Sequence, residues 1–125
     1  MQQLQFELSW DKAIAALDRQ YIEKIFNETK QTKDAEFICS PIREAINHKE
    51  ELLVTVLVHN FTEKNLIFNN KRLRYSIDGE IIAEEVFSLP SFVIPSRVSK
   101  PWTFIFPKGS YVQKNSYDQG HLELL

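Results

Sequence analysis

The sequence contains a single cysteine and three glycines, and each scarcity excludes a class of protein. Cys39 alone cannot form a disulfide within the chain or supply a cysteine-rich zinc site, and a lone thiol suits a reducing compartment. So few glycines cannot build a phosphate cradle, and no P-loop, dinucleotide-binding or nucleophile-elbow motif occurs. We therefore expect neither a disulfide scaffold nor a nucleotide-binding enzyme.

Long apolar runs and an excess of either charge are also absent. The longest apolar run, residues 52–58, is interrupted by Thr55 and is far shorter than the roughly 20 residues that span a bilayer. Residues 1–8 lack the basic and apolar segments of a secretory signal. The 15 Lys and Arg against 17 Asp and Glu give a net charge of −2, so bulk attraction to nucleic acid or anionic lipid is not expected. We expect a cytoplasmic protein without an integral membrane segment.

What the sequence does contain begins with an amphipathic helix over residues 10–29. A short alternating strand at residues 4–8 precedes it, Ser9 is placed to act as its N-cap, and the polar stretch 29–34 links it to the rest. Apolar residues recur there at intervals of three or four positions: Trp10, Ile14, Leu17, Tyr21 and Ile25. The opposite side is charged, so the helix should dock through its apolar face.

Residues 36–108 show short apolar segments separated by turns. The expected strands are 37–46 with an interruption at Pro41, 52–60 as the central strand, 66–68, 73–77, 81–89 and 102–106. Asp78-Gly79 is a hairpin signal. The pattern predicts a mainly β fold, an immunoglobulin-like antiparallel β-sandwich with one N-terminal amphipathic helix. We expect one domain over residues 1–108, with strand and helix in 1–30, and a loosely ordered tail over 109–125.

Residues that could carry chemistry are few. The histidines, His48, His59 and His121, lack the spacing of a metal site, so no metal or cofactor is expected. Cys39 could act as a nucleophile if His48 or His59 lay beside it, although a buried free cysteine is more often a small apolar residue. A small-ligand or catalytic domain that uses His59 and Cys39 is the alternative kept open.

Charged clusters give a second alternative. Neighbouring residues of a strand point to opposite faces, so the pairs at 50–51 and 84–85 indicate solvated carboxylates rather than an acid–base site. Lys71, Arg72 and Arg74 form the basic cluster of the chain and could contact phosphates of a nucleic acid. We favour charges on a solvent-facing strand that discourage pairing of sheet edges, and expect no nucleic-acid partner.

A partner surface is predicted near residues 91–100, where two prolines bracket an expected loop. The loop contains Phe92, Val93 and Ile94, which a surface loop would display to a protein partner, or which tuck under the rim of the sandwich. In the last strand three aromatic residues share one face, and Trp102 is the one expected to stay partly exposed.

Several segments, taken in order, resemble the SLAP domain, named for accessory Sec system S-layer assembly proteins of Bacillus and its relatives. They are residues 4–6 (LQF) with Trp10, 53–60 (LVTVLVHN), 87–90 (FSLP), 94–95 (IP) and 100–107 (KPWTFIFP). The aromatic segment after Pro101 is the most specific of them, and His59 departs from the arginine that is usual there. The resemblance covers about residues 1–108.

The resemblance implies a non-catalytic protein-interaction module, an accessory or adaptor on the cytoplasmic side of accessory Sec-linked export or S-layer assembly. Its partner would be a Sec export component or an S-layer precursor, and it brings no catalytic residues with it. Binding of an extended peptide at a free strand edge is a suitable mode, because it needs only unpaired backbone groups.

Overall fold

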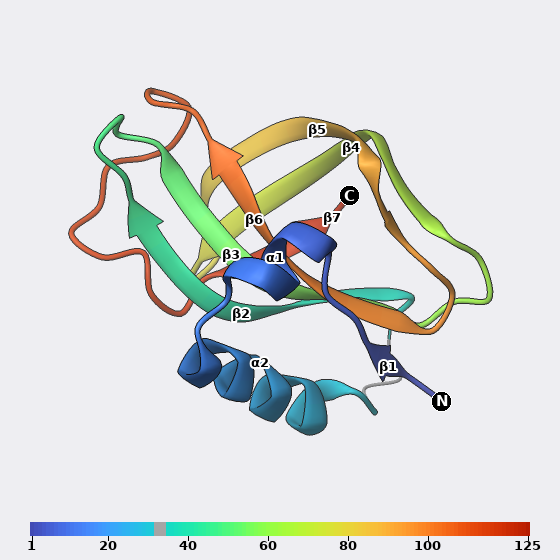
Figure 1. Ribbon diagram of the computed structural model, residues 1–125. Coiled ribbons are helices and arrows are strands. Elements are labelled where there is room, and N and C mark those ends of the chain that lie inside the picture. Colours follow the sequence, from blue (N-terminus) through green and yellow to red (C-terminus); the bar gives the residue numbers. More distant parts are fainter. Residues whose placement is uncertain (32–34) are drawn as a thin grey trace.

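Two β-sheets pack face to face in the computed structural model, which describes residues 1–31 and 35–125 (Figure 1). The first sheet has the order β1 (Gln3–Leu4), β6 (Val98–Phe106), β3 (Leu52–Asn60) and β2 (Phe37–Ile46). The second sheet has the order β5 (Glu80–Ile94), β4 (Leu66–Ile77) and β7 (His121–Leu124). The predicted mainly β sandwich is confirmed, whereas its immunoglobulin-like topology stays a prediction.

The strand pairs are antiparallel except for β1 and β6, which run parallel. β2 lies against β7 and β5 against β6, so these pairs form the two sides of the sandwich. β3 is an interior strand as predicted, and the register of β2 shifts between Pro41 and Arg43, at the expected interruption. Pro41 is tolerated because β2 is an edge strand.

Alternating apolar side chains fill the space between the sheets. Along β3 the buried residues of the inner face are Leu52, Val54, Val56 and Val58. They meet Phe104 and Phe106 of β6, against which Phe87 of β5 packs edge-on with ring centroids at 5.2 Å and 5.5 Å. Successive strand residues point to opposite faces, which is why a period-2 pattern marked these strands in the sequence.

The predicted helix over 10–29 is two helices, α1 (Leu8–Ala13) and α2 (Ala16–Thr29). Ile14 takes an extended backbone with ψ 134°, which ends the first helix. Ser9 lies inside α1, so the predicted cap at Ser9 is wrong. The break turns the chain (Figure 1), and side chains of both helices then reach one cluster on the outer face of the first sheet.

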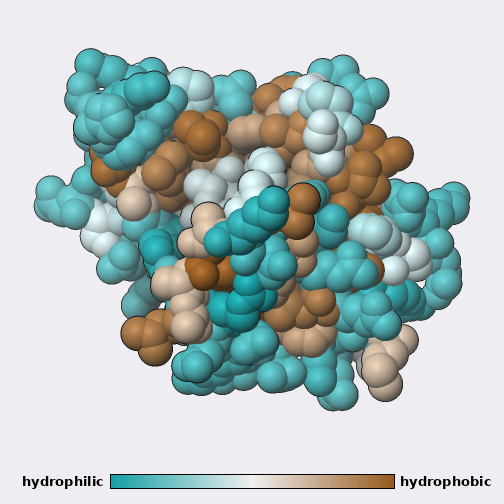
Figure 2. All heavy atoms as spheres, viewed as in Figure 1, coloured by the Kyte–Doolittle hydropathy of each residue, from teal (hydrophilic) through white to brown (hydrophobic). Residues whose placement is uncertain are grey.

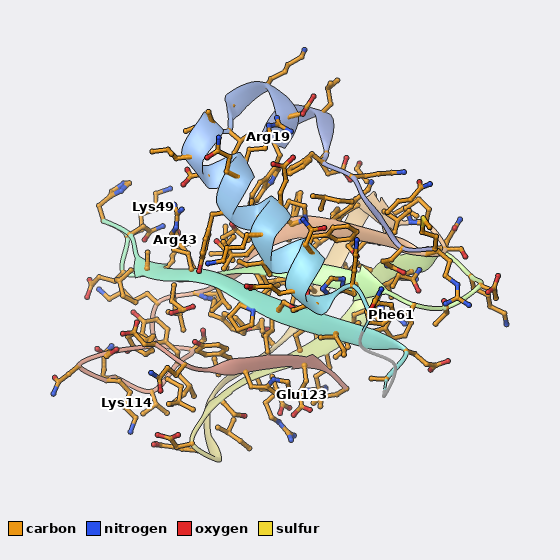
Figure 3. All side chains as sticks on the ribbon, turned by 90° about the horizontal axis from the view of Figure 1, so that it is seen from below. Arg19, Arg43, Lys49, Phe61, Lys114 and Glu123 are labelled. Carbon is orange, nitrogen blue, oxygen red and sulfur yellow. The ribbon has the colours of Figure 1, made fainter. Side chains whose placement is uncertain are left out.

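The buried face of α2 includes Ile25, as predicted, but otherwise differs from the predicted one. Ile22, Ile25 and Phe26 pack with Leu57 on the outer face of the first sheet, whereas Leu17 is 78% exposed. The prediction assumed one continuous helix with 3.6 residues per turn. The break at Ile14 ends that helix, so residues of α2 point in other directions than a continuous helix would give them. Figure 3 shows α2 lying over β2, with β7 on the other side of that strand.

β5 is longer than predicted. Asp78 and Gly79 have positive φ angles of 50° and 82° and form the predicted hairpin turn, after which β5 continues to Ile94. The expected loop over 91–100 is therefore wrong: residues 95–97 alone join β5 to β6. Edge position and an irregular register near Pro90 let this strand contain a proline.

The tail predicted over 109–125 is also ordered in part. Residues 121–124 form β7, which pairs antiparallel with β4, and Leu122 is 1% exposed in the core. The Tyr75 hydroxyl donates to the carbonyl oxygen of Tyr117 at 2.5 Å, which fixes the approach to β7. Residues 32–34 of the expected polar link lie outside the described residues.

Candidate interaction site

The side of the sandwich formed by β5 and β6 contains a hollow of about 310 Å³. The Trp102 ring stacks on the Phe92 ring with centroids 4.3 Å apart and an angle of 23° between the planes. The remaining lining residues are Leu89, Pro90 and Ser91 of β5, together with Glu7 and Ser9 at the start of α1. A partly exposed indole at the base of a concave surface can bury an apolar side chain of a partner.

Two contacts shape this hollow. Lys100 Nζ lies 3.3 Å from Glu7 Oε1, and the Lys100 side chain is only 12% exposed. This ion pair holds the start of α1 beside β6. It also balances the charge of Glu7, which is the charged residue in the lining of the hollow. Figure 2 shows apolar atoms along the upper half of this view, where Figure 1 places β5 and β6. The hollow therefore suits an uncharged guest.

The predicted partner residues are placed differently from the expectation. Phe92 and Ile94 are buried, at 2% and 0% exposure, because they belong to a strand whose side chains enter the core, so display of them on a surface loop is wrong. Val93 is half-buried. Trp102 is partly exposed, as predicted. Phe92 supports Trp102 from beneath, and partner binding at this site stays a prediction.

Beside the hollow, β6 has an open edge. β1 covers only its first residues: Gln3 N–H donates to Arg97 O at 2.9 Å and Gln5 N–H to Ser99 O at 3.0 Å. In a strand, the N–H and C=O of every second residue point to the same side. Ser99 points its backbone groups toward β1, so Thr103 and Ile105 point their N–H and C=O groups to this open edge. In the described chain no strand pairs with β6 beyond Ser99 on that side.

A buried polar network around His59, at the C-terminal end of β3, joins α2 to the first sheet. His59 is fully buried, with Nε2 2.8 Å from Thr29 Oγ1 and Nδ1 2.6 Å from Ser99 Oγ. The Thr29 hydroxyl donates to Ile25 O at 2.6 Å, so it accepts from His59, and the ring is the neutral Nε2–H tautomer. Burial lowers the pKa of His59 to about 4.

Asn60 secures the adjacent loops. Its side-chain NH₂ donates to the carbonyl oxygens of Lys64, Ile94 and Pro95 at 2.7 to 3.2 Å, and its Oδ1 accepts from Thr62 N–H and Oγ1. A fully buried amide needs such partners, since an unsatisfied one is costly. Asn60 was noted in the sequence only as part of the resemblance, and its role is to hold the β5–β6 connection.

Cys39 and His59 do not form a catalytic pair. Cys39 lies opposite Val58 and His59 opposite Ile38, so the two side chains belong to successive register positions and point to opposite faces of the sheet. Cys39 is buried between the sheets, and burial raises its thiol pKa to about 12. A protonated thiol on the far face from the imidazole has no base to activate it.

The basic cluster is partly neutralised. Arg72 and Arg74 lie on one face of β4 and both contact Glu84 of β5, at 3.1 Å and 2.8 Å. The arginines lower the pKa of Glu84, which keeps this carboxylate charged. Lys71 lies opposite Phe87 and not in this ion-pair cluster. Surface charges that pair across strands account for the arginines. Because β4 lies between β5 and β7, the predicted role of discouraging pairing at a sheet edge is wrong.

Two searches of the described residues concern other kinds of site. Residues 1–31 and 35–125 contain no group of three or more His, Cys, Asp or Glu placed to hold a metal ion. None of the helices described is both long and apolar enough to cross a membrane. The sequence signals did not reveal the lining residues Glu7, Ser9 and Ser91, because only the packing of α1 against β5 and β6 brings them together.

Comparison with known proteins gave one finding. A family model described as the SLAP domain matches residues 4–124 of the 125-residue chain. No match was found among curated proteins or among solved structures. The matched range includes β7 and so extends beyond residue 108, to which the resemblance in the sequence had been traced.

Proposed function

Because this chain belongs to the SLAP domain family, we propose that it is a non-catalytic protein-interaction module of accessory Sec-linked export or S-layer assembly. Its partner is a Sec export component or an S-layer precursor, met on the cytoplasmic side of the membrane. The family match over nearly the whole chain carries this proposal. Fold alone does not assign function, so the site must supply the mode of binding.

The hollow at Trp102 supports such a role. It combines a partly exposed aromatic ring, held in place by Phe92, with an open strand edge alongside. Aromatic anchors of this kind commonly dominate the energy of protein interfaces. The two alternatives receive less support, since Cys39 and His59 face opposite sides of the sheet and Arg72 and Arg74 are paired with Glu84.

Capture of partners from a cell that forms a surface layer tests the proposal. The full chain, immobilised, is expected to recover a Sec component or an S-layer precursor, identified by mass spectrometry. Ser91→Arg places a long charged side chain at the rim of the hollow without changing the core, because Ser91 is exposed. We expect this variant to reduce recovery at least about tenfold.

The matched control is Gln113→Arg, which adds the same charge at an exposed residue outside the lining of the hollow. Its recovery should equal that of the unchanged protein. Equal loss in both variants would mean that added charge, and not the hollow, matters. Recovery of ribosomal or metabolic proteins alone would contradict the role in export.

A further inference from the structure

We propose that the open edge of β6 binds an extended, uncharged segment of a partner protein as an added β-strand, with apolar side chains of that segment in the hollow at Trp102. This inference rests on the proposed function, because it takes the molecule bound at the edge to be a segment of a protein partner. Strand addition supplies affinity through backbone hydrogen bonds and specificity through pockets for alternate side chains.

The residue composition of the open edge of β6 bears on whether it can pair with another chain. Edge strands of monomeric proteins usually carry charges that prevent pairing with other chains. Among the other edge strands of the described structure, charges lie in β2 (Arg43, Glu44), β5 (Glu84, Glu85) and β7 (Glu123), whereas β1 and residues 86–94 of β5 contain none. Residues 101–106 (PWTFIF) of β6 contain no charged residue. Beyond Pro101, which itself removes one donor from the edge, this edge therefore lacks the charges that usually protect an edge strand.

The backbone of β6 shows which groups a guest strand would meet. Arg97 O and Ser99 O accept from β1, so the same edge next presents Pro101 O and both backbone groups of Thr103 and Ile105. Pro101, which has no N–H, lies at a position that does not donate to β3. The open stretch 101–106 is about 20 Å long, and β1 already demonstrates parallel pairing at its start.

Both faces of a guest strand would meet apolar surface. On the inner face lies the hollow with Trp102 and Phe92, and on the outer face Ile105 is 46% exposed. The charged residue in the lining, Glu7, is already paired with Lys100, so no charge selects an acidic or basic guest. These features indicate a peptide of alternating β-branched or aliphatic residues.

A flexible peptide fits this site better than a second copy of the chain. A folded edge strand has its inward side chains engaged in its own core, whereas an unfolded segment can place them in a hollow of about 310 Å³. In addition β1 occupies the start of the edge, which shortens the length available to a second sheet. We therefore assign the site to an extended segment, as in a precursor that has not yet folded.

Proline substitution at the edge tests the inference on the full chain. In Thr103→Pro the N–H that points to the open edge is lost, while the hydrogen bonds between β6 and β3 remain. Thr103→Val is the matched control, since both variants lose the 2.8 Å contact between Thr103 Oγ1 and Thr55 Oγ1 and only the proline removes the N–H. The probe is a dye-labelled ten-residue peptide of alternating threonine and valine with a lysine at each end.

Fluorescence anisotropy should show saturable binding of the probe to the unchanged protein and to Thr103→Val, and binding at least about tenfold weaker for Thr103→Pro. A probe of the same length in which proline replaces three of the central residues should not bind. Urea unfolding establishes that both variants are folded. If Thr103→Pro does not fold, Ile105→Pro with Ile105→Val replaces the pair.

Equal affinity of the proline and valine variants would overturn the inference. So would a concentration-dependent dimer, seen by light scattering, that Thr103→Pro abolishes while no probe binds, because the occupant would then be a second copy. The synthetic probe separates this inference from the proposed function. Probe binding without recovery of Sec or S-layer proteins contradicts the function alone, and recovery that Thr103→Pro leaves unchanged contradicts the edge alone.

Discussion

A chain that ends at Gln119 is expected not to fold. Removal of residues 120–125 takes away β7, uncovers Leu73 and Tyr75 in the core, and leaves one side of β4 without a partner. Loss of the Leu122 side chain alone should cost about 3 kcal/mol of unfolding free energy. The whole strand should cost a large part of the roughly 5–15 kcal/mol that stabilises a domain. Circular dichroism and urea unfolding would show loss of the cooperative transition.

Point variants of the full chain provide the control. His121 is exposed on the same strand as the buried Leu122, so His121→Ala should change stability by no more than about 0.5 kcal/mol while Leu122→Ala lowers it by about 3 kcal/mol. A truncated chain with the unfolding midpoint of the full protein would contradict the result. That result would support the sequence-based prediction that residues 109–125 form a loosely ordered tail.

The second large effect is a loss of stability on acidification that depends on His59. Burial lowers the pKa of this imidazole from 6.5 to about 4 in the folded protein. Between these values the unfolded chain binds a proton that the folded chain does not, so stability falls as pH falls through this window. The shift corresponds to about 3 kcal/mol between pH 7 and pH 4. Urea unfolding at several pH values measures it.

The structure explains why the folded protein resists this proton. His59 Nδ1 already accepts from Ser99 Oγ, and Ser99 Oγ accepts from Gln2 Nε2 at 3.0 Å. Protonation of Nδ1 would turn the acceptor into a donor and leave the serine hydroxyl hydrogen without its partner in a dry site. The ring also lies between the rings of Phe26 and Phe61, which supply no charge to offset it.

His59→Gln isolates the effect, because its amide can donate to Thr29 and accept from Ser99 but does not titrate. The variant should lose the extra slope between pH 7 and pH 4. Glu44, whose pKa is raised mainly by burial, titrates in both proteins and cancels from the difference. The same pH dependence in both proteins would show that the folded state protonates His59 without penalty.

Local patterns predicted those parts of the fold that local chemistry controls. Period-2 alternation marked β3, the Asp78-Gly79 pair marked the hairpin, and Pro41 marked the interruption of β2. The failures share a cause. The apolar period ran on through the break at Ile14, two prolines marked a loop over 91–100, and only residues 109–125 lacked a pattern; in all three segments, packing or partner strands decided the outcome.

The candidate site shows the same division. Trp102 could be recognised as a partly exposed aromatic residue at the end of an apolar strand, whereas Phe92 beneath it was predicted equally well on the surface or under the rim. Glu7 and Ser91 gave no signal, because they are more than 80 residues apart in the sequence and meet only when α1 settles beside β5.

The sequence by itself determined the class of protein and its family: a mainly β domain with a docked helical segment and residues 101–106 (PWTFIF) free of charge. Side-chain period and turn residues act over a few positions, so they are readable without the fold. Only the tertiary structure decided that β1 stops after two residues, that β7 completes the second sheet, and that β6 is left with an open edge beside a hollow. Those features depend on which distant segments pair, and no local pattern contains that information.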